Sequence, residues 1–403
     1  MQDITRPTAV MSERRVTFVG ALLTTLGPIS MAIYTPAMPQ LVQAFGTTEA
    51  AIKLSLSLFF GGFAVAQLVA GPLSDALGRR TATLIFLAIY LIGSALAFVA
   101  PTVEAILVAR LVQGIGASVG VVIGRAIVRD LYTGANAARI LNMIGIFLAI
   151  GPALGPTLGG LALAAFDWHA VFVLMIAFGV VATACTFFLL KETVVPDPSR
   201  LEPKQLIVNY AEVARKPIFL ATSLVLSGTI GALYAQATML AFILINRVGL
   251  TPTQFGIGML MQSGFFLLGS ITLKMLSARL GNLVCARVGI TLCGIGAIVM
   301  ALSVAWLEPF FLSIMGPVAI CAFGLALVSP YVVTVGMAPF PHIAGSASAL
   351  TGFLQMAGGF VGGFLAASLG DPLTAFGIII PAMEIMACAA FLWLTYLLKH
   401  QKA

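Results

Sequence analysis

The feature that most constrains this chain is a series of long apolar stretches. A helix crosses the hydrocarbon core of a bilayer with about twenty consecutive, mostly apolar residues. A scan with a window of that length finds twelve stretches: 17–37, 51–73, 82–100, 103–124, 141–164, 170–190, 218–245, 254–274, 286–305, 309–334, 344–368 and 373–397. Because backbone groups exposed to lipid must form hydrogen bonds within their own segment, these stretches are predicted to be helices. The chain is therefore predicted to be an all-α polytopic membrane protein.

Composition and charge placement agree with this class. Only 9% of the 403 residues are charged, whereas soluble domains carry roughly a quarter charged residues. Of the 21 Lys and Arg residues, eighteen fall in loops on the side of the N-terminus, Lys53 and Arg247 fall on the other side, and Arg110 lies within a span. The positive-inside rule then predicts that both termini are cytoplasmic. Because no basic patch is interleaved with aromatic residues, nucleic acid is not expected as a partner.

One long polar connection divides the spans six and six. It is the segment 191–217, which has mixed charge, three prolines in its first half, and the pattern of an amphipathic surface helix at 203–214. A shift of the sequence by 203 positions aligns LSDALG (73–78) with LSARLG (276–281). The same shift places Gly155, Gly159 and Gly160 on Gly358, Gly362 and Gly363.

This repeat predicts two pseudo-symmetric six-helix halves. Because each half holds an even number of spans, the repeat is parallel, as in transporters whose substrate site lies near the membrane midplane between the halves. The predicted organisation is a cytoplasmic tail (1–16), a six-helix bundle (17–190), a cytoplasmic linker (191–217), a second six-helix bundle (218–397) and a cytoplasmic tail (398–403).

Several motifs resemble those of one transporter family. The stretch GPLSDALGRRT (71–81) resembles the loop motif between helices 2 and 3 of the major facilitator superfamily, and LVARLVQGIGAS (107–118) resembles its conserved-arginine motif. GPALGPTLGG (151–160) is similar to the glycine-proline motif of its drug:proton antiporters. RAIVRD (125–130) and YTPAMP (34–39) are similar to the bicyclomycin/chloramphenicol-resistance branch of twelve-helix exporters. The resemblance covers nearly the whole chain and implies the fold of this superfamily.

The resemblance also implies a function. It implies a secondary transporter of the bacterial inner membrane that exports small amphiphilic or neutral compounds, conferring antibiotic resistance, in exchange for protons by alternating access. The expected partners are the substrate, protons and membrane lipid; a monomer is expected, and no cofactor or metal. Export or facilitated passage of an endogenous metabolite, without proton coupling through helix 1, is the alternative, and a receptor or scaffold that transports nothing is a further one. An enzyme is not expected, because the three histidines are scattered, and the phosphate-binding loop of an ATP-driven pump is missing from the sequence.

The charged loop at 71–81 is the first candidate site. Gly71 and Gly78 permit a tight turn and a close approach of helices. Arg79 and Arg80 are expected to be solvated residues that set the topology and face anionic lipid.

Asp75 is expected to act as a conformational latch on the cytoplasmic side. Topology does not require an acid here, and the aligned position of the second half is Ala278. The expected partners of Asp75 are Arg125, Arg129 and the positive N-terminal end of the helix near 344–348. The resemblance implies a latch that comprises Gly71, Asp75, Gly78, Arg79, Arg80, Arg125, Arg129 and Asp130.

Arg110 lies about eight residues into its span from the outer side. A guanidinium at that depth costs free energy and usually faces a bundle interior or an aqueous cavity. Snorkelling towards the outer headgroups is the alternative. The resemblance links this arginine to proton coupling, with Gln113 as a neighbour one turn inward.

The acid that the resembled exporters carry in helix 1 is missing from this chain. Two residues before the tyrosine of the YxP motif stands Ala32. The acid that remains near the bilayer centre is Glu384, and a protonated packing residue is the alternative role for it. The candidates for proton coupling are Arg110, Glu384 and Asp75, of which Asp75 lies at the membrane edge.

The resemblance implies a substrate cavity lined by helices 1, 4, 7 and 10. The candidates on these helices are Met31, Tyr34, Gln113, Tyr234, Gln236, Met239 and Tyr331. Methionine and aromatic surfaces adapt to varied apolar ligands, although ordinary helix packing is the alternative for each residue alone. The few charges among them predict a neutral or amphiphilic substrate.

The glycine-proline run predicts a special helix. Gly151, Gly155 and Gly159 repeat the small-residue spacing that lets helices pack closely in lipid. Pro152 and Pro156 remove backbone donors and bend the helix. Together with Gly160, they predict a bent, tightly packed helix that shapes the closure of the outer side.

Overall fold

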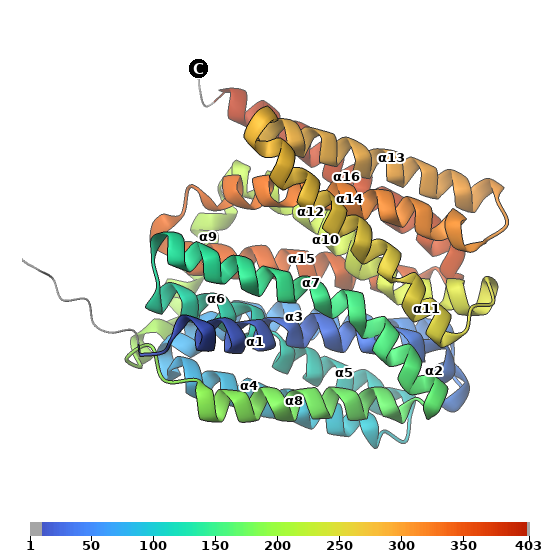
Figure 1. Ribbon diagram of the computed structural model, residues 1–403, viewed down its shortest axis with the longest axis horizontal. Helices are drawn as coiled ribbons and strands as arrows, with labels where there is room; N and C mark the ends of the chain where they lie inside the picture. Colours follow the sequence, from blue (N-terminus) through green and yellow to red (C-terminus); the bar gives the residue numbers. More distant parts are fainter. Residues whose placement is uncertain (1–9, 401–403) are drawn as a thin grey trace, which may run out of the picture.

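The protein is a bundle of long helices, seen in a computed structural model that describes residues 10–400 (Figure 1). Within this range twelve helical segments are long and apolar enough to cross a membrane, which confirms the predicted number. Most of them extend beyond the apolar windows, because helical hydrogen bonding continues into the more polar segment ends. The outermost parts of the two predicted tails, residues 1–9 and 401–403, lie outside the described residues.

The spans form two groups, one below the other in Figure 1. The first group is built from α1 (Glu13–Tyr34), η1 (Thr35–Ala37), α2 (Met38–Ala44), α3 (Glu49–Leu77), α4 (Arg79–Phe98), α5 (Val103–Ala117), α6 (Val119–Leu131), α7 (Gly134–Ala165) and α8 (His169–Leu189). The second group is built from α10 (Pro217–Ala241), η3 (Phe242–Arg247), α11 (Pro252–Gly258), α12 (Leu260–Leu280), α13 (Asn282–Trp306), α14 (Phe311–Met337), η4 (Pro341–Ile343), α15 (Ala344–Ser368) and α16 (Pro372–His400). α1 begins and α16 ends at the same end of the bundle. This end is called the inner end below, after the charge-based prediction, and the opposite end the outer end.

The linker between the groups holds η2 (Pro198–Leu201) and α9 (Pro203–Ala214). α9 occupies the residues predicted for the amphipathic helix. Its Tyr210 hydroxyl donates a hydrogen bond of 2.6 Å to the carbonyl oxygen of Leu68 in α3, and burial raises the pKa of Tyr210 to about 12. The phenol therefore remains a donor, and it ties the linker to the first group.

Threonines start several of the spans at the outer end. The hydroxyl groups of Thr48 and Thr102 accept hydrogen bonds from the backbone N–H groups of Ala51 and Ala105. Thr251 forms a capping box with Gln254 at the start of α11. These caps satisfy backbone donors that have no partner within the helix.

The internal repeat predicted from the 203-residue shift is present in the backbone. Gly78, between α3 and α4, has a φ of +92°, and its aligned partner Gly281, between α12 and α13, has a φ of +79°. Residues with a Cβ rarely adopt these angles. Both halves therefore make the same tight turn at the same position.

The glycine motif of α7 packs against α1. A Cβ added to Gly155 would lie 2.4 Å from the Cβ of Ala32, and one added to Gly159 would lie 2.4 Å from the carbonyl oxygen of Ile33. Gly151 faces the same helix, where Thr25 is the nearest side chain. Only a missing side chain allows this distance between the two helices.

The aligned glycines of α15 pack against α10 in the same way. A Cβ added to Gly358 would lie 2.5 Å from the hydroxyl of Ser227, and one added to Gly362 would lie 2.6 Å from the Cβ of Ala235. The repeat therefore extends from the sequence to helix packing.

The third glycine of each motif touches the other group. A Cβ on Gly160 of α7 would lie 2.3 Å from the carbonyl oxygen of Pro252 in α11. A Cβ on Gly363 of α15 would lie 2.4 Å from the hydroxyl of Ser57 in α3. These two positions bring the two groups together.

We predict that Gly160→Ala prevents full closure of the outer end. The added methyl group would meet backbone, which cannot rotate away, and overpacking of this kind costs about 1–3 kcal/mol. The variant should reach the membrane at wild-type levels but transport substrate about tenfold more slowly. Gly145→Ala is the matched control, because no described residue comes within 4 Å of a Cβ at that position of α7. Equal transport by the two variants would show that the close contact at Gly160 is dispensable.

Candidate functional site

A small apolar cavity lies between the two groups. Its volume is about 10 Å³, which is room for about one water molecule. It is lined from the first group by Gly27, Pro28, Met31, Phe59, Phe60 and Phe63, and from the second group by Tyr234 and Met356. The rings of Phe60 and Tyr234 meet across the boundary at 5.4 Å between centroids.

Two of the predicted cavity residues, Met31 and Tyr234, line this cavity. The prediction omitted α3 and α15, which contribute three phenylalanines and Met356. The phenylalanines at positions 59, 60 and 63 lie on one side of a helix. This aromatic cluster was the available signal for a wall at the boundary between the groups.

Three other predicted cavity residues lie outside the lining of this cavity. Met239 is completely buried in the hydrophobic core of the second group. Tyr234 and Thr238 are four residues apart and share one side of α10, whereas Met239 lies on a different side. Tyr331 packs against a second core cluster of that group. Gln236 is buried and donates a hydrogen bond of 3.1 Å to Gln262 of α12.

Arg110 is fully buried among neutral side chains of the first group. Its guanidinium carbon lies 4.2 Å from the ring centroid of Tyr34 and 4.4 Å from that of Phe59. Its Nη1 donates to Gln113, whose own amide donates to Ser94 at 2.7 Å. The predicted pairing of Arg110 with Gln113 is therefore present, and two aromatic faces hold the cation from either side.

This arginine retains unused hydrogen-bond donors. Its Nε and Nη2 atoms are buried without a hydrogen-bond partner in the described part of the chain. Ala32, at the position of the acid in the resembled exporters, faces Gly155 of α7 instead. The guanidinium is thus stabilised by aromatic rings and one amide.

Lys53 closes the outer end of the bundle across the two groups. It is completely buried, and its ammonium group donates hydrogen bonds of 2.9 Å and 2.6 Å to the carbonyl oxygens of Ala366 and Gly370. These carbonyls belong to the C-terminal end of α15, where the helix dipole favours a positive charge. Sequence analysis counted Lys53 only as an outer charge, although a lysine within the predicted span 51–73 was a usable signal.

Further polar contacts join the groups at the same end. The Glu49 carboxylate accepts a hydrogen bond of 3.0 Å from Asn246. Thr157 donates to the carbonyl oxygen of Gly256 at 3.0 Å. At the inner end, by contrast, α12 turns away from α7 (Figure 1). The outer side is closed in this structure.

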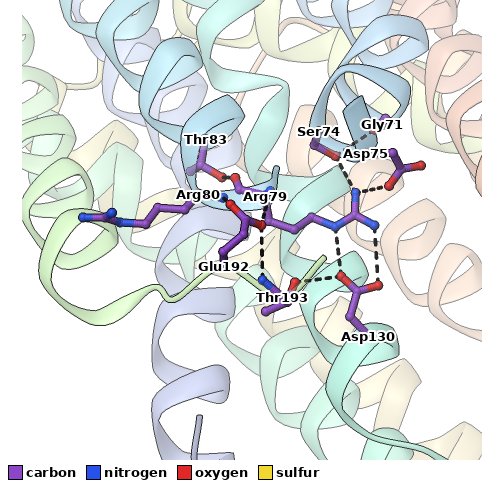
Figure 2. Close-up of polar contacts among 9 residues, drawn as sticks. All are labelled: Gly71, Ser74, Asp75, Arg79, Arg80, Thr83, Asp130, Glu192 and Thr193. Atoms are coloured by element: carbon purple, nitrogen blue, oxygen red, sulfur yellow. Dashed lines mark hydrogen bonds and ion pairs between the residues drawn. The ribbon is translucent and has the colours of Figure 1, made fainter. Parts of the chain in front are cut away.

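The charged loop forms a network around Arg79 (Figure 2). The prediction of a solvated Arg79 is wrong, because only 3% of this residue is exposed. Its guanidinium forms an ion pair with Asp75, a second one of 2.9 Å with Asp130, and a hydrogen bond of 2.6 Å to Ser74. Burial of the arginine is possible because two carboxylates accompany it.

The start of the linker completes the network. The Glu192 carboxylate accepts hydrogen bonds of 2.6 Å and 3.1 Å from the backbone N–H groups of Arg79 and Arg80, at the N-terminus of α4 (Figure 2). Thr193 donates to Asp130 at 2.9 Å. Arg80 points the other way and donates to the Phe187 carbonyl oxygen at 2.9 Å. The loop thus joins α3, α4, α6 and the linker.

The other predicted latch residues lie near this network. Arg125 and Arg129 of α6 are both exposed. The guanidinium of Arg129 comes within 4.0 Å of the Cβ position of Gly345, in the first turn of α15. The N-terminus of α15 therefore faces Arg129 of the other group. Sequence analysis predicted a contact of this helix end with Asp75, whose carboxylate forms an ion pair with Arg79 here.

Glu384 lies in the core of the second group. It is 3% exposed, and one of its carboxyl oxygens has no hydrogen-bond partner among the described residues. The thiol of Cys293 is its side-chain hydrogen-bond partner. Its neighbour Met383 contacts Gly231 of α10 and Gly362 of α15. The carboxyl is thus outside the cavity lining but close to the contact of three helices.

We predict that Asp75→Asn leaves the protein in the membrane but largely abolishes transport. The amide removes one of the two charges that compensate buried Arg79. The cost is below the value of about 3–5 kcal/mol for a fully uncompensated buried charge, because Asp130 remains, but the substitution weakens the contact between α3 and α4. Transport of a fluorescent amphiphilic dye and the amount of protein in the membrane measure the effect. Glu202→Gln, at an exposed acid of the linker, is the control. Normal flux through Asp75→Asn would reduce Asp75 to a surface charge.

Comparisons with known proteins agree with this architecture. The chain is 24% identical to Multidrug resistance protein D of Escherichia coli over 388 residues, which cover 94% of this chain and 95% of that one. It is 26% identical to a Bicyclomycin resistance protein homolog of Haemophilus influenzae, over 89% of this chain and 91% of that one. A D-xylose-proton symporter of known structure has the same fold, with a TM-score of 0.69, 13% identity and coverage of 93% and 97%. Residues 20–363 match the family model of the Major Facilitator Superfamily, and the chain therefore belongs to this superfamily of membrane transporters.

Proposed function

We propose that this protein exports small amphiphilic compounds from the cytoplasm by alternating access, in exchange for protons. The observation that carries the proposal is the cavity between the two groups. Both groups line it with aromatic and methionine side chains, and the contacts of Lys53 and Gly160 close it on the outer side. Relatives named as drug-resistance proteins support the same class of substrate.

The size of the cavity supports movement of the two groups against each other. Sites for drug-sized ligands measure about 300–1,000 Å³, whereas this cavity measures about 10 Å³. A substrate can therefore enter only when Phe60 and Tyr234 separate. Because these residues belong to different groups, rocking of the groups opens and closes the site.

Glu384 is the proposed proton site. An unpaired buried carboxyl oxygen is costly and is more common at functional positions than in ordinary packing. Protonation of Glu384 changes the charge inside the second group, and Met383 connects this position to α10 and α15. Two residues of the cavity lining lie on these helices, Tyr234 on α10 and Met356 on α15. A movement of α16 would therefore displace part of the cavity wall.

A facilitator of an endogenous metabolite is the second candidate. It is favoured by Ala32, which packs against Gly155 where the resembled exporters have an acid. In such a protein the groups would rock without a proton, and substrate would only move down its gradient.

The test measures substrate flux in proteoliposomes with and without an imposed pH gradient. The wild type is expected to accumulate a fluorescent amphiphilic drug against its gradient when protons flow the other way. Glu384→Gln, which keeps the shape and removes the charge change, should lose pH-driven accumulation and keep downhill exchange. Glu308→Gln, at an exposed acid of the second group, should behave as wild type.

Full pH-driven accumulation by Glu384→Gln would make this residue a packing residue. A wild type that ignores the gradient would favour the facilitator.

A further inference from the structure

We propose that the preferred substrates are amphiphilic organic anions, whose charged group is received by Arg125 on the inner side of the cavity and by Arg110 on its outer side. The inference rests on the proposed transport function and names the substrate class of the same cavity. It narrows the neutral or amphiphilic compounds expected from the sequence to compounds with an apolar body and one carboxylate or sulfonate.

The two arginines lie on opposite sides of the cavity along the bundle. α1 runs from the inner to the outer end and lines the cavity with Gly27, Pro28 and Met31. Arg110 lies outward of these residues, because it stacks on Tyr34 at the outer end of α1. Arg125 lies inward, because the preceding Gly124 packs against Gly20 and Thr24.

Both arginines are connected to the wall of the cavity. Phe59 covers the guanidinium of Arg110 on one side and lines the cavity. Arg125 lies one helical turn before Arg129 on α6 and so shares the side of this helix that faces α15 of the second group, where Arg129 approaches Gly345. A ligand that pushes the Phe59 ring aside therefore meets Arg110.

The hydrogen-bond inventory of Arg110 indicates an anionic ligand. The Nε and Nη2 donors of this side chain are buried and have no partner among the residues that the structure describes, and arginine stays protonated in proteins. A carboxylate or sulfonate accepts two parallel hydrogen bonds from such a fork. A neutral ligand would leave the charge uncompensated, and a cationic ligand would be repelled.

The surrounding acids do not supply this anion. Among the described residues that line the cavity none is a carboxylate. Glu384 lies in the core of the second group next to Cys293, and both Asp75 and Asp130 accompany Arg79 at the inner end. The charge near the cavity is therefore positive, which attracts anions by long-range electrostatics.

A set of three probes of one shape tests the inference. 2-Naphthoate, 2-naphthamide and 2-naphthylmethylammonium share an apolar body and differ in charge. Binding to the purified full-length protein is measured by equilibrium dialysis. We expect 2-naphthoate to bind at least about tenfold more tightly than 2-naphthamide, and the ammonium compound to bind most weakly. Equal binding of the acid and the amide, or tighter binding of the ammonium compound, overturns the inference.

Charge variants locate the binding energy. Arg125→Gln, at an exposed position, should weaken binding of 2-naphthoate by about tenfold and leave 2-naphthamide unchanged. Arg110→Gln should do the same if it folds, and Arg125→Gln decides the question if it does not. Arg215→Gln, at an exposed arginine of the linker, controls for a general loss of positive charge. Unchanged discrimination between acid and amide in Arg125→Gln would contradict the assignment.

The same proteoliposomes separate this inference from the transport proposal. Efflux of a neutral drug by the wild type, with no preference for 2-naphthoate, would contradict the anion assignment and leave the transport proposal intact. If the wild type moves neither the drug nor any naphthyl probe, both the transport proposal and the anion assignment are contradicted. Transport of 2-naphthoate that declines in Arg125→Gln supports both.

Discussion

Close approach of helix backbones at glycine is the constraint on which the rest of this structure depends. In lipid, helices gain little from burial of apolar side chains against one another, so they associate through close packing and polar contacts. Gly155 and Gly159 bring α7 onto α1, and Gly358 and Gly362 bring α15 onto α10. Gly160 and Gly363 then bring the two groups together. The cavity is small because these contacts hold its walls close.

Three buried cations are stabilised in three different ways, and each way corresponds to a different role. Arg79 is compensated by two carboxylates and holds the inner loop together. Lys53 is compensated by the carbonyl end of α15 and joins the groups at the outer end. Arg110 is held by aromatic rings and keeps two donors unpaired. The first arrangement is structurally complete, the second joins the two groups, and the third is the one that we propose an anionic ligand completes.

The sequence was sufficient for the fold and for only part of the site. Span number, the linker helix at 203–214 and the repeat depend on local apolar patterns and on glycines, which can be read from the sequence directly. Burial of Arg79 depends on Asp130 and Glu192, which lie far away along the chain. The role of Lys53 depends on the end of α15 more than 300 residues later, since its two acceptors are separated from it by 313 and 317 positions. The prediction that Met239 lines the cavity was wrong because the sequence does not show which side of a helix faces a cavity when every side is apolar.

Alternating access requires the outer contacts between the two groups to open and close during transport. The most direct measurement uses Glu49→Cys and Asn246→Cys together, in a background without the five native cysteines, because the two native side chains meet across the groups at 3.0 Å. A short bifunctional methanethiosulfonate reagent links the pair, and substrate flux is measured before linking, after linking and after reduction. The account predicts that linking stops transport and that reduction restores it, while either single variant is unaffected. Undiminished transport by the fully linked protein would contradict alternating access at this end of the molecule.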